Sequence, residues 1–140
     1  MRHLIVRTFE LTLIIGLCFV AIYSQSTSTS TPARYATVNA VLENTSNKTV
    51  LIWATGNVPK TLADTSKFRV APGTKKGLVV TVPANGQVKF TASAGPTPDK
   101  SDILGATLGT CIWRQEPNTP NKVPYVVYNG SGLTCGSTTK

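Results

Sequence analysis

Histidine is nearly absent from the sequence, which has a single one, His3, and only six acidic residues among 140. His3 lies in an N-terminal segment that we expect to be removed, so the remaining chain has no imidazole. Catalysis by a Ser-His-Asp or Cys-His arrangement would then lack its general base, and zinc sites built on histidine are excluded. The carboxylates form no Asp-x-Asp-x-Asp calcium loop. We therefore predict a protein that is not an enzyme and that holds no metal or cofactor.

One pair of carboxylates stays open as a catalytic candidate. Asp99 and Asp102 are close together in the segment TPDKSDI, and glycoside hydrolases use such pairs. The segment is rich in turn residues, and Lys100 lies between the two acids. A role in capping a turn is therefore favoured over an enzymatic role, which would need these acids or Glu116 to work without histidine.

The N-terminus has the features of a secretory signal peptide. Arg2 and Arg7 provide a basic start, residues 11–23 (LTLIIGLCFVAIY) are apolar and uncharged, and small polar residues follow. The apolar run is shorter than the roughly 17–25 residues that a membrane-spanning helix needs. The alternative, an uncleaved anchor, would place Arg7 and Glu10 inside the span. We predict a signal peptide at 1–24 and a secreted, extracellular protein.

The rest of the chain reads as a linker followed by one domain. Residues 25–34 include the run STSTSTP, which lacks apolar side chains and predicts a flexible Ser/Thr-rich linker. Residues 35–140 are enough for a single domain.

Cysteine is scarce, and only Cys111 and Cys135 remain once Cys18 leaves with the signal peptide. In a secreted domain the two most simply form one disulfide. It would close a loop of 24 positions and add about 3 kcal/mol to stability. The alternatives are two free thiols or a bond to another molecule.

Residues 35–140 alternate between apolar and polar side chains, with turn signals between the runs and almost no helical periodicity. The segment 49–55, TVLIWAT, is apolar on both faces, as a central strand should be. Seven or eight short strands predict an all-β fold, a small antiparallel β-sandwich. The turns NTSNK and PANG are expected to join neighbouring strands, since Asn-Gly favours hairpins. The expected strands are 35–43, 49–55, 67–71, 78–82, 87–93, one within 103–113, 123–128 and 133–135.

Basic residues predominate, giving a formal net charge of +8. Without Arg2, Arg7 and Glu10, 12 basic and 5 acidic residues remain. If strands 67–71, 78–82 and 87–93 pair in sequence order, five basic residues share one face: Lys67, Arg69, Lys75, Lys76 and Lys89. Such a face attracts anionic glycans or lipid head groups. The alternative is a solvated face that only keeps the protein soluble. Nucleic acid is not expected, because basic and aromatic residues are not interleaved.

The aromatic residues divide into two groups. Trp53 and Trp113 lie in the most apolar segments, and we expect them in the core. Tyr125 and Tyr128 precede the loop at Asn129 and are candidate contacts to sugar or lipid.

Three N-glycosylation acceptor patterns fall in expected turns, at Asn44, Asn47 and Asn129. Asn44 and Asn47 are so close that we expect at most one of them to be fully occupied. The same residue types are also ordinary in turns.

The stretch NTSNKTVLIWAT resembles the opening strand-turn-strand of small secreted or lytic β-sandwich families such as the aegerolysins. Those proteins are typically acidic, whereas this chain is basic, and no residue role is transferred.

These observations lead to one functional hypothesis with two alternatives. The hypothesis is a secreted, non-catalytic binding protein whose basic face docks an anionic glycan or membrane surface. The alternatives are a membrane-active or toxin-like β-sandwich module, and a secreted effector or structural wall protein. The sequence gives no prediction of the oligomeric state.

Overall fold

The computed structural model describes residues 36–96 and 102–140. The chain divides into two units, Met1–Pro32 and Ala33–Lys140, and every described residue belongs to the second. The expected signal peptide and linker lie outside the described residues. Within those residues, no helix has the length and apolar character needed to cross a bilayer.

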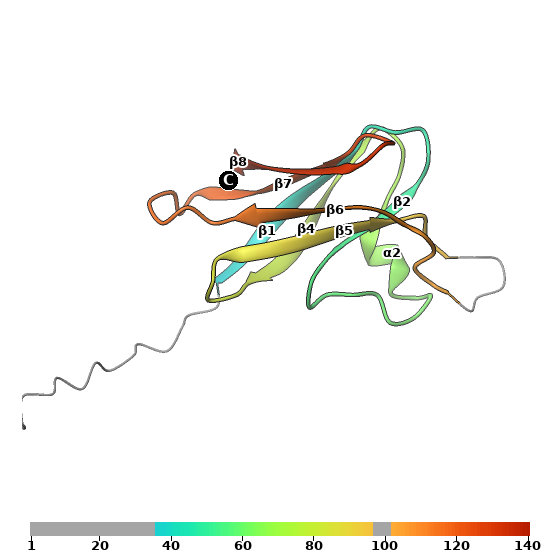
Figure 1. Cartoon of the computed structure of the whole chain (residues 1–140), viewed down its shortest axis with the longest axis horizontal. Coiled ribbons are helices and arrows are strands. Elements are labelled where there is room, and N and C mark those ends of the chain that lie inside the picture. Colours follow the sequence, from blue (N-terminus) through green and yellow to red (C-terminus); the bar gives the residue numbers. More distant parts are fainter. Residues whose placement is uncertain (1–35, 97–101) are drawn as a thin grey trace, which may run out of the picture. The chain divides into compact units, whose positions relative to one another are not determined.

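In the described ranges, eight strands and one helical turn build two four-stranded sheets that pack face to face (Figure 1). The elements are β1 (Ala36–Asn44), β2 (Val50–Ala54), α2 (Thr65–Phe68), β3 (Arg69–Val70), β4 (Thr74–Val82), β5 (Gln87–Ser93), β6 (Thr107–Arg114), β7 (Lys122–Tyr128) and β8 (Leu133–Thr139). Sheet A has the order β4-β1-β7-β8, and sheet B has the order β3-β2-β5-β6. The predicted all-β sandwich is confirmed.

One strand pair departs from the expected antiparallel arrangement. Val41–Asn44 of β1 runs parallel to Tyr125–Tyr128 of β7, while all the other pairs in the described chain are antiparallel. A parallel pair needs a long crossover connection. Here the connection is most of the domain, because the chain passes through sheet B between β1 and β7.

Two turns that we expected to close hairpins instead carry the chain from one sheet to the other. The turn after β1 leads into β2 of sheet B, and the turn at Pro83–Gly86 leads from β4 of sheet A into β5 of sheet B. The second turn has the predicted chemistry, since Gly86 has φ +67° and donates to the Pro83 carbonyl at 2.9 Å. The turns were predicted correctly, but the pairing of the strands that flank them was wrong.

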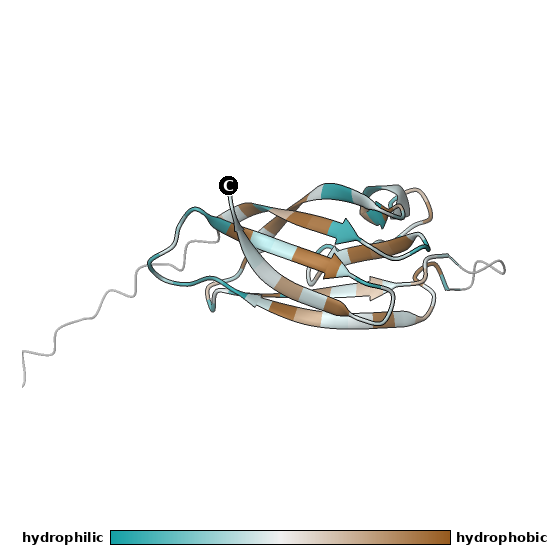
Figure 2. Ribbon diagram, turned by 90° about the horizontal axis from the view of Figure 1, so that it is seen from above, coloured by the Kyte–Doolittle hydropathy of each residue, from teal (hydrophilic) through white to brown (hydrophobic). Residues whose placement is uncertain are grey.

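The core lies between the sheets and is built by alternation along the strands, visible as brown segments between paler ones in Figure 2. All five residues of β2 are buried, in keeping with its central position. Val88, Phe90 and Ala92 point inward as predicted. Trp53 and Trp113 are 6% and 3% exposed, which confirms that both are buried, Trp113 in this core and Trp53 in a second cluster.

One side of the sandwich is closed by covalent and polar links between β6 and β8. The predicted disulfide between Cys111 and Cys135 is confirmed, with Cα atoms 5.6 Å apart. Beside it, the indole Nε1 of Trp113 donates to Ser137 Oγ at 2.9 Å. Two adjacent links therefore tie the edge strand of sheet B to that of sheet A.

The segment expected as a strand at 67–71 begins differently. Residues 65–68 form the helical turn α2, and only Arg69 and Val70 form a strand, β3. Phe68 was expected to face the core between the sheets, but it packs with Leu51 and Trp53 in a second, smaller cluster. Those two β2 side chains lie on the outer face of sheet B and need a cover, which the helical turn provides.

Candidate functional site

Four of the five predicted basic residues lie on the open side of the sandwich, where the edge strands β3 and β4 come into contact. Lys67 is in the last turn of α2, Arg69 is on β3, and Lys75 and Lys76 are on β4. We name these four residues the basic edge. The expected pairing of the three strands in sequence order is wrong, because β4 pairs with β1 whereas β3 and β5 both pair with β2. The basic edge is therefore assembled across both sheets.

The fifth basic residue, Lys89, lies elsewhere. Arg69 stands opposite Leu51 at the start of β2, whereas the Lys89 carbonyl accepts a bond from the Thr55 amide just past the end of β2. These positions differ by about 13 Å along the strands and by about 10 Å across two of them. Lys89 is consequently not part of the basic edge.

Lys76 has a structural role within the basic edge. Its register partner is the buried Leu42, so its side chain starts on the inner side of an edge strand. Its Nζ donates to the Ser66 carbonyl at 2.9 Å and to the Arg69 carbonyl at 3.4 Å. Lys76 thereby links sheet A to α2 and β3. An inward-pointing charge on an edge strand also opposes edge-to-edge aggregation.

Lys75 lies on the outer face of sheet A in a small polar cluster. Its Nζ is 3.5 Å from a Glu43 carboxylate oxygen and 5.3 Å from the centroid of the Tyr125 ring. The Tyr125 hydroxyl donates to the same carboxylate oxygen. The Lys75 side chain is 61% exposed. An ion pair this exposed contributes about 0–1 kcal/mol, so an external anion can compete for the ammonium group.

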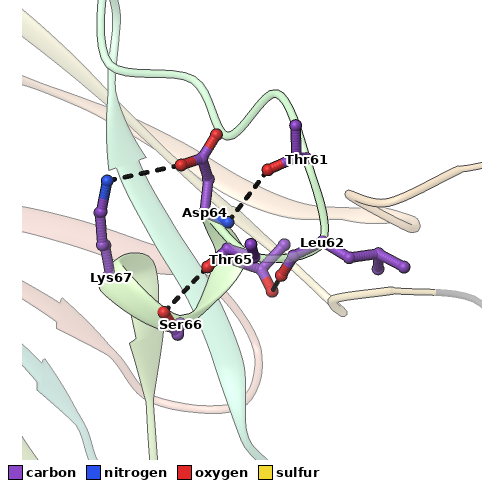
Figure 3. A network of polar contacts seen from close by, with 7 residues as sticks. Thr61, Leu62, Asp64, Thr65, Ser66 and Lys67 are labelled. Carbon is purple, nitrogen blue, oxygen red and sulfur yellow. Dashed lines mark hydrogen bonds and ion pairs between the residues drawn. The ribbon is translucent and has the colours of Figure 1, made fainter.

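Lys67 pairs with Asp64 at the surface of α2, as Figure 3 shows. The two charged atoms are 3.4 Å apart, and the Lys67 side chain is 72% exposed. Hydrogen bonding by the Thr61 side chain, helped by Lys67, lowers the pKa of Asp64 below its ordinary value. Asp64 therefore keeps its charge to lower pH than an ordinary aspartate does. Arg69, by contrast, makes no ion pair with any residue that the structure describes.

The two candidate tyrosine contacts are both engaged within the fold. Tyr128 is 5% exposed, packs in the core, and donates from its hydroxyl to the Gly130 carbonyl at 3.2 Å. Tyr125 is half-buried and is held by Glu43. Tyr128 is therefore too buried to stack on a sugar, and Lys75 lies over one face of the Tyr125 ring.

The three acceptor asparagines differ sharply in their surroundings. Asn44 is wholly buried, and its Nδ2 donates to the carbonyls of Lys48 at 2.7 Å and Val70 at 3.0 Å. Its Oδ1 accepts from both the amide and the hydroxyl of Ser46. Asn47 and Asn129 are exposed. The side-chain Nδ2 of Asn129, where a sugar would be attached, makes no hydrogen bond within the described part of the chain, whereas the backbone amide donates to the Gly132 carbonyl at 3.2 Å.

We expect this difference to decide which sites carry sugar. When the chain is secreted from a eukaryotic host, the folded protein should be modified at Asn129 and Asn47 and unmodified at Asn44. A sugar on Asn44 would replace one of the two Nδ2 hydrogens, so at least one of its hydrogen bonds would be lost, and it would require space around a wholly buried side chain. Peptide mapping by mass spectrometry, with an enzymatic deglycosylation control, measures each occupancy. Glycan on Asn44 in the folded fraction would contradict the expectation.

The structure describes two of the three carboxylate candidates, Asp102 and Glu116. Asp102 accepts a hydrogen bond from the Leu104 amide at 3.0 Å, which is the turn-capping geometry expected from the sequence. Asp99 and Lys100 lie outside the described residues. In residues 36–96 and 102–140, no three Cys, Asp or Glu side chains gather in a way that could hold a metal ion.

No family model, curated protein or solved structure matches the chain.

Proposed function

We propose that the protein is a secreted, non-catalytic binding protein that docks an anionic surface through the basic edge. The carrying observation is that Lys67, Arg69, Lys75 and Lys76 lie on elements along the side of the sandwich where β3 and β4 come into contact, although they come from three elements and both sheets. The disulfide is compatible with an extracellular location, where such bonds persist.

The local charge balance supports binding rather than internal neutralisation. The described ion pairs of the basic edge involve only Asp64 and Glu43, and both pairs are exposed at their lysine end. Lys60 lies beside Lys67 and Asp64 and adds a further positive charge. The net field is therefore positive, and a polyanion gains several contacts by displacing two weak pairs.

Binding should depend steeply on salt. On a heparin-like sulfated resin, we expect retention at low ionic strength and strong loss above about 0.15 M, where screening acts beyond roughly 8 Å. Salt-gradient elution of the intact, oxidised protein provides the measurement. Retention that is indifferent to salt, or no retention at low salt, would contradict the proposed function.

A second candidate surface, an anionic membrane, is favoured by the loop between β2 and α2. Val58 and Leu62 are each 43% exposed on this loop, and Val58 lies in the same shallow hollow as Lys60 and Lys67. Apolar side chains next to lysines suit the boundary between acyl chains and anionic head groups. Replacing both residues with serine should weaken binding to phosphatidylserine vesicles and leave heparin retention unchanged. If the double variant binds vesicles as well as the wild-type protein does, an anionic membrane is not the surface that this loop contacts.

A further inference from the structure

A hollow opens where sheet B is incomplete beside β5. β2 pairs with β5 only from Phe90 to Ser93, while β5 continues to Gln87 with β6 alone as its partner. The resulting hollow has a volume of about 530 Å³, within the usual range for small-molecule sites. It is lined by Thr55, Gly56, Thr81, Pro83, Asn85, Gln87, Val88, Lys89 and Ile112.

An unusually exposed apolar side chain forms part of this lining. Ile112 is 52% exposed in the middle of β6, although it lies in a regular strand with a packed sheet behind it. Pro83 adds further apolar surface to the same hollow, and the buried Val88 lies behind it. A single exposed isoleucine is ordinary, but one set in a concave, mainly apolar site has a surface that a ligand can bury.

A positive charge stands next to this apolar surface. Lys89 is directly opposite Ile112 in the antiparallel register of β5 and β6. Facing residues of such a pair have Cβ atoms about 5 Å apart on one face of the sheet. No carboxylate lines the hollow, and among the described residues Lys89 forms no ion pair. The site therefore combines an unneutralised ammonium group with an apolar neighbour.

The walls of the hollow are held in place by bonds to the backbone. The amide and the hydroxyl of Thr55 both donate to the Lys89 carbonyl, at 2.9 and 3.3 Å. Asn57 Nδ2 donates to the Val79 carbonyl on β4 at 3.1 Å. Asn85 Oδ1 accepts from the Gln87 amide at 3.1 Å. The hollow is thus formed before any ligand arrives.

We propose that this hollow binds a small amphipathic carboxylate, a molecule with an apolar body and one anionic end, such as a medium-chain fatty acid. The apolar body covers Ile112 and Pro83, and the carboxylate meets the ammonium group of Lys89. This site is separate from the basic edge and does not depend on the function proposed for it.

The test uses decanoate and decanol as probes, which share an apolar chain and differ in charge. Titration of the oxidised domain with decanoate below its micellar concentration should shift the backbone amides of Gly56, Gln87, Lys89 and Ile112 in nitrogen-15 correlation spectra. Lys89→Gln should weaken decanoate binding about fivefold and leave decanol binding unchanged, because only the carboxylate loses its partner. Ile112→Ser should weaken both ligands.

Two control variants test whether the loss of binding is specific to the hollow. Lys122→Gln removes an equally positive side chain on β7, and Val58→Ser removes an exposed aliphatic one on the loop before α2; neither lines the hollow. Both should leave the decanoate affinity unchanged. Amide shifts scattered over the domain, no binding at millimolar decanoate, or equal losses in Lys89→Gln and Lys122→Gln would overturn the proposal.

Discussion

Replacing Asn44 with alanine is expected to destabilise the folded domain by about 2–4 kcal/mol, a large share of the stability of a small protein. The side chain joins the end of β1 to the following turn and to β3 through the carbonyls of Lys48 and Val70. Alanine would remove both bonds, of which the one to the Val70 carbonyl is buried, whereas the Lys48 carbonyl still accepts from the Ser46 hydroxyl at 3.1 Å. Urea unfolding of unglycosylated protein, made in a bacterial host and oxidised, measures the change in the free energy of unfolding.

Asn47 provides the matched control for this prediction. It lies three residues away in the same turn, but it is exposed, so Asn47→Ala should cost less than about 0.5 kcal/mol. Asn44→Asp keeps the Oδ1 acceptor and loses the amide donor, and it should fall close to Asn44→Ala. Equal midpoints for the Asn44 and Asn47 variants would show that the buried network does not stabilise the fold.

Removing the disulfide should have the other large effect on stability. The Cys111→Ser/Cys135→Ser double variant is expected to lose about 3 kcal/mol, because the bond closes a loop of 24 positions and restricts the unfolded chain. The bond also joins the two sheets at their edge strands, where no backbone pairing holds β6 to β8. Thermal and urea unfolding of the oxidised, reduced and double-variant proteins give the comparison.

A smaller change on the same side of the sandwich controls for local packing. Ser137→Ala removes only the hydrogen bond from Trp113, so it should cost about 1 kcal/mol. The reduced wild-type protein and the serine double variant should unfold at similar midpoints. A reduced protein as stable as the oxidised one, with reduction verified by mass, would contradict this role of the bond.

The sequence predicted the local structure of the domain better than its strand partners. Alternation in 87–93 identified the buried Val88, Phe90 and Ala92, because side chains in a strand change face at every residue. That alternation does not determine which strands pair with one another in a sheet. The Asn-Gly turn before Gln87 has the same chemistry whether it closes a hairpin or crosses between sheets, and here it crosses.

The helical turn α2 illustrates a second kind of error. A period of two in KFRVA predicted a strand with Phe68 facing the core. Phe68 instead covers Trp53 on the outer side of sheet B. This position is set by tertiary packing and not by the local sequence pattern. The apolar character of TVLIWAT on both faces was the available signal that this strand needed a cover on each side.

The candidate site was predicted in composition but not in arrangement. The basic residues were identified from charge alone, and four of the five lie on elements at one side of the sandwich. The sequence did not contain the reason, which is that two edge strands from different sheets come into contact there. The ion-pair partners of Lys67 and Lys75 differ in whether they could be predicted from the sequence. Asp64 is visible three positions before Lys67, but Glu43 faces Lys75 only because β1 and β4 pair in that register.

The most direct test of the basic edge is a comparison of two charge-reversal pairs on heparin-like resin. Lys67→Glu/Arg69→Glu alters the basic edge, and Lys89→Glu/Lys122→Glu makes the same change in net charge elsewhere. The pairs are matched, since each contains one lysine that is ion-paired with a carboxylate, Lys67 with Asp64 and Lys122 with Glu116. We expect the first pair to elute at much lower salt than wild type, and the second pair to elute close to it. Equal losses in both pairs would show that net charge, and not the basic edge, binds the polyanion.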